Sequence, residues 1–298
     1  MAYDGTKYRT WDRSTPNDGL EFEAEYNKIY ANTNALAGNG TSAPDKTIQQ
    51  LANESNSIKT VATGDSPYTI ADSDAYSIYS VDTSGGDVTI TLPTLADNQG
   101  KKIKIVHTIA GNTLTVDGEG AETLGGEVAT IELTKINDML EVQGVSSTWA
   151  ILNMKVSAQL RLSGYAGYGS TDNRIFRFTT KDEGYGNVFS ENHTGGYNAN
   201  AEGIEITINL SGKYEFQLTM QSTGSGWGGL SLNSSQLTTN IESITAADRL
   251  AGGRATSANN VANCTWSGQL ANGDVVRAQG DGTSGTGMVH FSATFLGN

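Results

Sequence analysis

Regular alternation of apolar and polar residues over most of the chain after residue 61 predicts a mainly β protein. Segments such as Asp87–Pro93 and Lys213–Met220 alternate strictly, as strands with one buried face do. Glycine accounts for 36 of the 298 residues and supplies many turns. We therefore expect short N-terminal helices, a small antiparallel β module and a C-terminal jelly-roll β-sandwich.

Residues 1–60 differ from the rest because their apolar residues follow a helical period. A heptad-like spacing predicts one helix after Asp18 and a second, shorter one after Pro44. The apolar stripes could pack on this chain, on other copies of it, or into a larger particle. The residues expected to make this packing are Phe22, Tyr26, Ile29, Leu36, Ile48, Leu51 and Ile58.

The pattern of residues 61–155 predicts the small β module. Six alternating segments are separated by turn sequences such as Ser84–Asp87 and Gly111-Asn112, and we interpret these turns as hairpins of an antiparallel sheet. Pro93 ends its strand, because proline cannot donate a hydrogen bond to a central ladder.

Residues 156–170 are rich in glycine, serine and tyrosine, and their composition predicts a linker. Residues 171–298 then contain about eight alternating segments, the number expected for a jelly-roll head. Tyr214, Phe216, Phe291 and Phe295 fall on the apolar faces of their segments, and we expect them in its core.

The charge balance excludes several classes of function. A net charge of -13 argues against a nucleic-acid binder, since such proteins need a positive footprint. No apolar run is long enough to insert into a membrane, and the polar start lacks a secretory signal. We therefore expect synthesis in a cytosol without export.

Catalytic and metal-binding motifs are weak. Two G-x-G-x-x-G matches precede strand-like sequence, whereas dinucleotide binding needs a helix there. Three scattered histidines and the single Cys264 leave little basis for a metal site or a cysteine nucleophile. Paired carboxylates such as Asp182/Glu183 and Glu202/Glu205 read more simply as solvated charges. We expect no catalytic residue, no metal and no cofactor.

Aromatic residues among glycines are more informative. Tyr185, Tyr197 and Trp227 lie in such surroundings, and His193 lies in a neighbouring polar loop. Exposed aromatic rings often bind sugars or protein edges, although these rings could equally fold back onto the sandwich. Together the four residues form the predicted receptor-contact set.

The last 125 or so residues resemble the head shared by complement globular domains and the tumour necrosis factor superfamily. The resemblance is carried by Gly212-Lys-Tyr214-Glu-Phe216, by Leu270-Ala-Asn-Gly273 and by the closing Phe291–Leu296. It implies a homotrimer with an apolar axis. The collagen-like stalk of animal members is absent, so their ligands and calcium sites are not implied.

The middle region resembles a small β module of bacteriophage fibre proteins, through Val88–Pro93, Gly100–Ile105, Gly111–Thr115 and Thr148–Leu152. The resemblance implies a virion fibre or spike, assembled in the host cytoplasm and held to other virion proteins by its N-terminus. Its head would attach to a host glycan or protein. A polysaccharide-degrading enzyme and a non-viral bacterial adhesin remain alternatives.

Overall fold

The computed structural model describes residues 57–192, 202–257, 259–281 and 288–297. The chain divides into two units, residues 1–57 and residues 58–298, and the following description concerns the second. The predicted helices and six of the seven N-terminal packing residues, Phe22 to Leu51, lie outside the described residues. No helix in the described part is long and apolar enough to cross a membrane.

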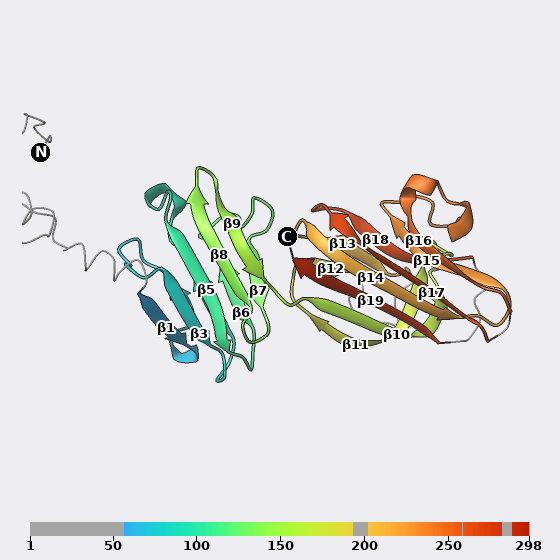
Figure 1. The fold of residues 1–298 in the computed structure, drawn as a ribbon, viewed down its shortest axis with the longest axis horizontal. Coiled ribbons are helices and arrows are strands. Elements are labelled where there is room, and N and C mark those ends of the chain that lie inside the picture. Colours follow the sequence, from blue (N-terminus) through green and yellow to red (C-terminus); the bar gives the residue numbers. More distant parts are fainter. Residues whose placement is uncertain (1–56, 193–201, 258, 282–287, 298) are drawn as a thin grey trace, which may run out of the picture. The chain divides into compact units, whose positions relative to one another are not determined.

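The first part of this unit is a module of two sheets facing each other (Figure 1). The five-stranded sheet has the order β1-β3-β5-β8-β9, and the four-stranded sheet has the order β2-β4-β6-β7. The strands are β1 (Ile58–Ala62), β2 (Tyr68–Thr69), β3 (Ile78–Asp82), β4 (Val88–Thr91), β5 (Lys102–Ile109), β6 (Leu114–Asp117), β7 (Thr130–Leu133), β8 (Met139–Val145) and β9 (Thr148–Lys155).

The module is not antiparallel throughout, and this part of the sequence prediction is wrong. Strands β1, β3 and β5 pair in parallel, as do β2, β4 and β6. The predicted turns exist, but the turn at Ser84–Asp87 carries the chain from one sheet to the other instead of closing a hairpin. From β1 to β6, consecutive strands therefore alternate between the sheets, and strands two apart along the chain become parallel neighbours.

A buried polar group joins two of these crossovers. The Thr83 hydroxyl donates to the backbone carbonyl of Asn112 and lies 2.8 Å from Nε2 of His107. The Asn112 side chain in turn donates to the carbonyl of Thr83. Because buried polar groups need partners, this network favours stacking of successive crossovers over opening into hairpins.

The expected helical role of Ile58 is also wrong. Ile58 is the first residue of β1, where it pairs with Ile78 and is 60% exposed. The boundary at residue 60 therefore falls inside a strand. The predicted helix included Ile58 because its spacing from the preceding apolar residues fits a helical period. In a short segment such a spacing also arises by chance, and here the residue belongs to a strand.

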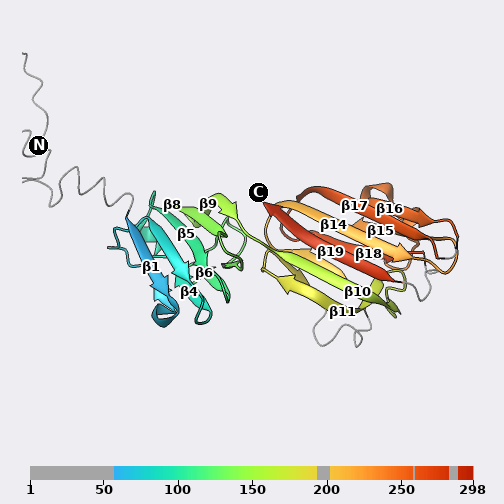
Figure 2. The same ribbon diagram turned by 60° about the horizontal axis from the view of Figure 1, so that its bottom comes forward.

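The second part is a two-layer antiparallel sandwich (Figures 1 and 2). One sheet has the order β11-β10-β19-β14-β17, and the other has the order β12-β13-β18-β15-β16. The strands are β10 (Gln159–Tyr168), β11 (Phe176–Tyr185), β12 (Phe189–Glu191), β13 (Glu205–Ile208), β14 (Gly212–Gln221), β15 (Gly226–Leu232), β16 (Arg249–Ala255), β17 (Val261–Leu270), β18 (Val275–Gly280) and β19 (Val289–Gly297).

The linker predicted over residues 156–170 is wrong, because strand β10 occupies most of it. This strand pairs with both β11 and β19. Its register with β11 shifts after Arg161 and again between Tyr165 and Tyr168. Gly167 lies within the second shift with φ of +91°, and Gly164, just before Tyr165, has φ of +76°. The glycines that suggested a linker thus make irregularities within a strand.

The sandwich core is aromatic. Tyr214, Phe216, Phe291 and Phe295 are all buried between the sheets. The rings of Tyr214 and Phe216 are stacked at 6.2 Å, and Tyr214 lies 5.1 Å from Phe295. The Tyr214 hydroxyl donates to the carbonyls of Leu210 and Val188, so its one polar atom is satisfied in the core.

The segment between β15 and β16 lies against the outer side of its sheet. It contains two short 3-10 helices, η3 (Ile241–Ser243) and η4 (Ala246–Asp248). Buried Ile241 packs close to Gly229, where a Cβ atom would come within 2.7 Å of it. The Gln279 amide fixes the same segment by donating to the carbonyls of Gln236 and Thr239.

Direct hydrogen bonds join the module to the sandwich. The Asn187 side chain accepts from the Glu132 amide and donates to the carbonyl of Thr130, so it continues the ladder of β7. The Glu127 carboxylate accepts from both the amide and the hydroxyl of Ser211. These bonds make a specific contact where the sequence suggested a flexible connection.

Candidate binding site

The ends of the sandwich serve as reference points. We call the base the end where β10 begins at Gln159, and the tip the end where β14 finishes at Gln221 and β15 begins. Gln159 pairs with Tyr185, and Gln221 pairs with Val261. Because β14 runs from base to tip and β15 returns, residues near 226 lie at the tip.

Tyr185 lies at the base and is engaged there. The ammonium group of Lys135 sits 4.1 Å from its ring centre, and its hydroxyl donates to the Gln159 side chain. Burial, more than its acidic neighbours, raises the pKa of this phenol. A ring held between the module and the sandwich is a packing residue rather than an open contact.

Trp227 lies in β15 at the tip and is half-buried. Its backbone amide donates to Oδ2 of Asp281 at 2.7 Å, and the guanidinium of Arg254 lies 5.9 Å from its ring centre. The structure therefore separates Trp227 from Tyr185, and these two do not form one surface. His193 and Tyr197 lie outside the described residues.

Two further glycine-flanked tyrosines fold back onto the sandwich, as the alternative interpretation of these rings allowed. The ring of Tyr168 lies 5.0 Å from that of buried Phe176, and Tyr165 meets Phe176 edge-on at 6.1 Å. Neither ring is presented as an isolated contact.

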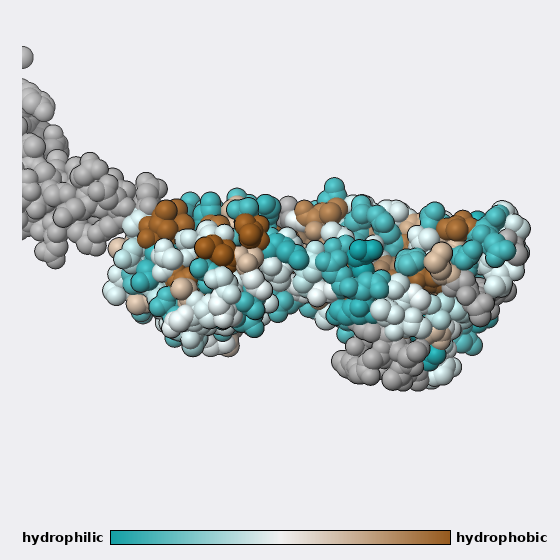
Figure 3. Space-filling view, turned by 90° about the horizontal axis from the view of Figure 1, so that it is seen from below, coloured by the Kyte–Doolittle hydropathy of each residue, from teal (hydrophilic) through white to brown (hydrophobic). Residues whose placement is uncertain are grey.

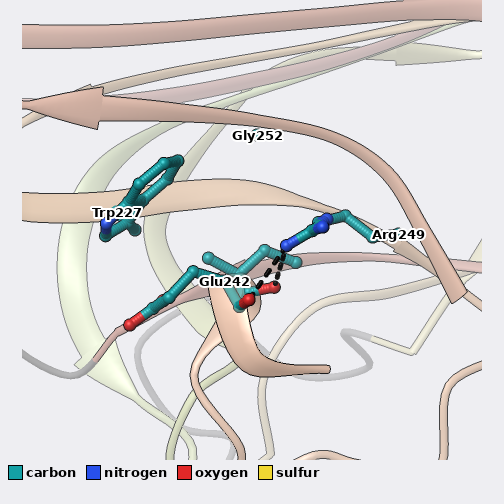
Figure 4. Close-up of a pocket in the computed structure, with 5 residues that line it drawn as sticks. Trp227, Glu242, Arg249 and Gly252 are labelled. Carbon is teal, nitrogen blue, oxygen red and sulfur yellow. Dashed lines mark hydrogen bonds between the residues drawn. The ribbon is translucent and has the colours of Figure 1, made fainter. Parts of the chain in front are cut away.

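A pocket of about 220 Å³ lies beside Trp227 (Figure 4). Trp227 and Gly252 line it from β15 and β16, and the other lining residues are Ile241, Glu242 and Arg249. In Figure 4, the Trp227 ring and the Glu242 side chain lie on one side, with Arg249 on the other. The sequence analysis missed the four partners of Trp227, because only the fold of the segment before β16 brings them together.

The polar groups of the pocket are partly satisfied. Nη1 of Arg249 donates to the carbonyl of Glu242 at 3.0 Å and to that of Ile241 at 3.4 Å, as the dashed lines in Figure 4 mark. Oε1 of Glu242 accepts from the Asn240 amide at 3.2 Å. Oε2 of Glu242 is buried and has no partner among the described residues.

Other reactive groups have structural partners. Glu205 is ion-paired with Arg277, and Asp182 accepts from the Ser163 hydroxyl, so one member of each carboxylate pair considered earlier has a structural partner. Burial raises the pKa of the Cys264 thiol to about 11. No group of three or more His, Cys, Asp and Glu residues in the described ranges is arranged to hold a metal ion.

Comparison with solved structures finds similarity to about half of the chain. The globular domain of zebrafish complement 1qA protein shows 15% identity and a TM-score of 0.30, over 47% of this chain and 97% of that one. Murine APRIL shows 12% identity and a TM-score of 0.33, over 47% and 99%. Bushbaby GITRL shows 10% identity and a TM-score of 0.27, over 48% and 96%. No family model and no curated protein matches the chain.

Proposed function

We propose that this protein is a non-enzymatic attachment protein of a bacteriophage virion. Its N-terminal segment anchors it to other virion proteins, and its sandwich binds a glycan or protein on the host surface. The observation that carries this proposal is the position of the Trp227 pocket. The pocket lies on the outer face of β15 and β16 with Trp227 toward the tip of the sandwich, whereas the chain enters the sandwich at the base, at the start of β10.

The chemistry of the tip supports binding without dependence on charge. After Asp182 the only lysines and arginines are Lys213, Arg249, Arg254 and Arg277. Arg277 is paired with Glu205. Arg174 and Arg177 precede Asp182 and lie at the tip end of the sandwich, where their guanidinium groups donate to the Asn240 side chain and to the carbonyl of Ala166. Such a surface suits aromatic stacking and neutral hydrogen bonds, and it offers few cations for anionic polymers.

Self-association as a homotrimer belongs to the same proposal. Exposed apolar side chains on the described surface support it, since contacts between copies would cover them. Figure 3 shows brown apolar patches over the module and others over the sandwich, with hydrophilic residues between them. The large exposed apolar residues are Ile58, Ile109, Ile136, Val145, Leu152, Val261, Met288 and Leu296.

The outward face of the sheet containing β14 and β19 is different in character. Gln217, Thr219, Ser292 and Thr294 lie on it and are polar and uncharged. Lys213 and Glu215, on the same face of β14, carry opposite charges. Copies packed through this sheet would meet through hydrogen bonds and little charge repulsion. An apolar axis, as the resemblance implies, would have to use exposed apolar residues such as Val261 and Leu296, which lie on the outward face of this same sheet.

Mass measurement tests the trimer. At micromolar concentration, light scattering should give about three times the chain mass of 31.4 kDa. A single species at the mass of one chain contradicts the trimer.

Attachment and anchoring are tested separately. Protein lacking residues 1–40 should still bind host cells and should no longer join virions. Binding should change little between about 50 and 200 mM salt, where charge-driven binding to a polyanion falls by roughly 10³-fold or more. Loss of binding over this range would contradict the neutral surface, and release of oligosaccharides from host polymer would indicate an enzyme.

A further inference from the structure

We infer that the Trp227 pocket binds a single neutral sugar ring. This inference rests on the proposed attachment function, and it names the chemical class that the tip recognises. It is carried by three features of the pocket: an aromatic wall, an open glycine floor, and side chains of both charges.

The wall and the floor leave a flat space. A Cβ atom at Gly252 would meet only the carbonyl oxygen of Gly228, 3.9 Å away, so a side chain could begin here without a close contact to the described chain. The Arg254 guanidinium lies 5.9 Å from the centre of the Trp227 ring. The same ring also lines the pocket. The apolar C–H face of a sugar can stack on such a ring.

The charges favour a neutral ligand. Glu242 opposes an anion, and Arg249 together with Arg254 opposes a cation, including a quaternary ammonium group. Hydroxyl groups suit both kinds of residue, because they donate to a carboxylate and accept from a guanidinium.

The volume of the pocket limits the size of the ligand. At about 220 Å³ the pocket is smaller than the roughly 300 Å³ at which sites for drug-sized ligands begin, so it admits one ring rather than a chain.

The test uses the full chain labelled with 5-fluorotryptophan. The four tryptophans give separate ¹⁹F resonances, and Trp227→Phe assigns the resonance of interest. The probes are methyl α-glucoside, methyl β-galactoside and N-acetylglucosamine, each titrated to about 100 mM because a single ring binds with millimolar affinity at best. At least one sugar should shift the Trp227 resonance saturably and leave the Trp149 and Trp266 resonances in place.

Two variants locate the binding. Gly252→Leu places a side chain in the open floor and should abolish the shift, while Gly64→Leu, at an equally open position in the module, should leave it unchanged. Unchanged Trp149 and Trp266 resonances show that each variant remains folded.

Three results overturn the inference: no shift with any of the three sugars, an equal shift in Gly252→Leu, or a shift with choline or inorganic phosphate in place of the sugars. Cell attachment, measured in parallel, distinguishes this failure from failure of the proposed function. If the protein attaches to cells but binds no sugar, the inference about the pocket is wrong and the attachment function stands. If it binds a sugar but does not attach to cells, the attachment function is wrong and the sugar site stands.

Discussion

The module and the sandwich are built from strands of the same alternating pattern, and they pair those strands in different ways. In the module, four neighbouring pairs are parallel, because short connections carry the chain from one sheet to the other. In the sandwich, every pair of strands is antiparallel, and several strands are ten residues long. Alternation decides which face of a strand is buried, and the connections decide which strand lies beside it.

The two cores also differ in what fills them. The module core is mostly aliphatic, with Trp149 and Tyr79 as its large fully buried rings. The indole of Trp149 donates to the Glu122 carboxylate at 3.1 Å. The sandwich core depends on the packed rings around Tyr214 and Phe216. Two cores of different composition, joined by hydrogen bonds, raise the question of whether the regions unfold together.

Removing one large ring from each core should have the greatest effect. Trp149→Ala and Phe216→Ala should each cost about 3–5 kcal/mol, because each ring is fully buried. Amide hydrogen exchange should accelerate in β5 and β8 for the first variant, and in β14 and β19 for the second. Equal acceleration in both regions for either variant would show that they form one cooperative unit.

A smaller effect is expected where the regions meet. Asn187→Ala removes the hydrogen bonds to the carbonyl and hydroxyl of Thr130 and leaves the Glu132 amide without its acceptor. The expected cost is about 1–3 kcal/mol, measured from the urea midpoint. Asn263→Ala, at an exposed position on β17, is the control and should change the midpoint little. Equal changes in both variants would mean that the contact at Asn187 adds no stability.

The smallest expected effects on stability concern its dependence on pH, in acid for the module and in alkali for the sandwich. Burial lowers the pKa of His107 in the module below its ordinary 6.5, so the folded state binds fewer protons than the unfolded state at acidic pH. The module should therefore lose stability as the pH falls below 6.5. The pKa of Cys264 in the sandwich is raised from 9.0 to about 11, so stability should be lost as the pH rises from 9 to 11.

The corresponding variants isolate each titration. His107→Gln should flatten the acid dependence of the urea midpoint, and Cys264→Ala should flatten part of the alkaline dependence. Each variant serves as the control for the other, since His107 and Cys264 lie in different regions. An unchanged acid slope in His107→Gln would show that carboxyl groups alone set it.

Several elements could be predicted from the sequence. The period-2 alternation located β4 to β9 in the module, and most strands of the sandwich, because a half-buried strand must alternate. The aromatic positions Tyr214, Phe216, Phe291 and Phe295 fell on buried faces for the same reason. Strand β16 was missed, since Gly252 and Gly253 interrupt its pattern, and β10 was hidden by its glycines.

The candidate site was predicted only in part. Trp227 was identified because an aromatic residue among glycines stands out in the sequence. Tyr185 belongs to the same pattern, yet the fold places it at the base with Lys135 over its ring. No sequence feature distinguishes the two, because the difference lies in what other segments bring to each ring.

The sequence by itself determined the class of fold, the faces that are buried and the small number of basic residues in the head, since these follow from residue type and local periodicity. The tertiary structure alone decided the parallel pairing of the module, the role of residues 159–168 as a strand, and the meeting of Trp227 with Glu242, Arg249 and Gly252. The physical reason is that local periodicity acts over a few residues. Pairing and pockets depend instead on which distant segments satisfy each other's backbone groups and fill each other's surfaces.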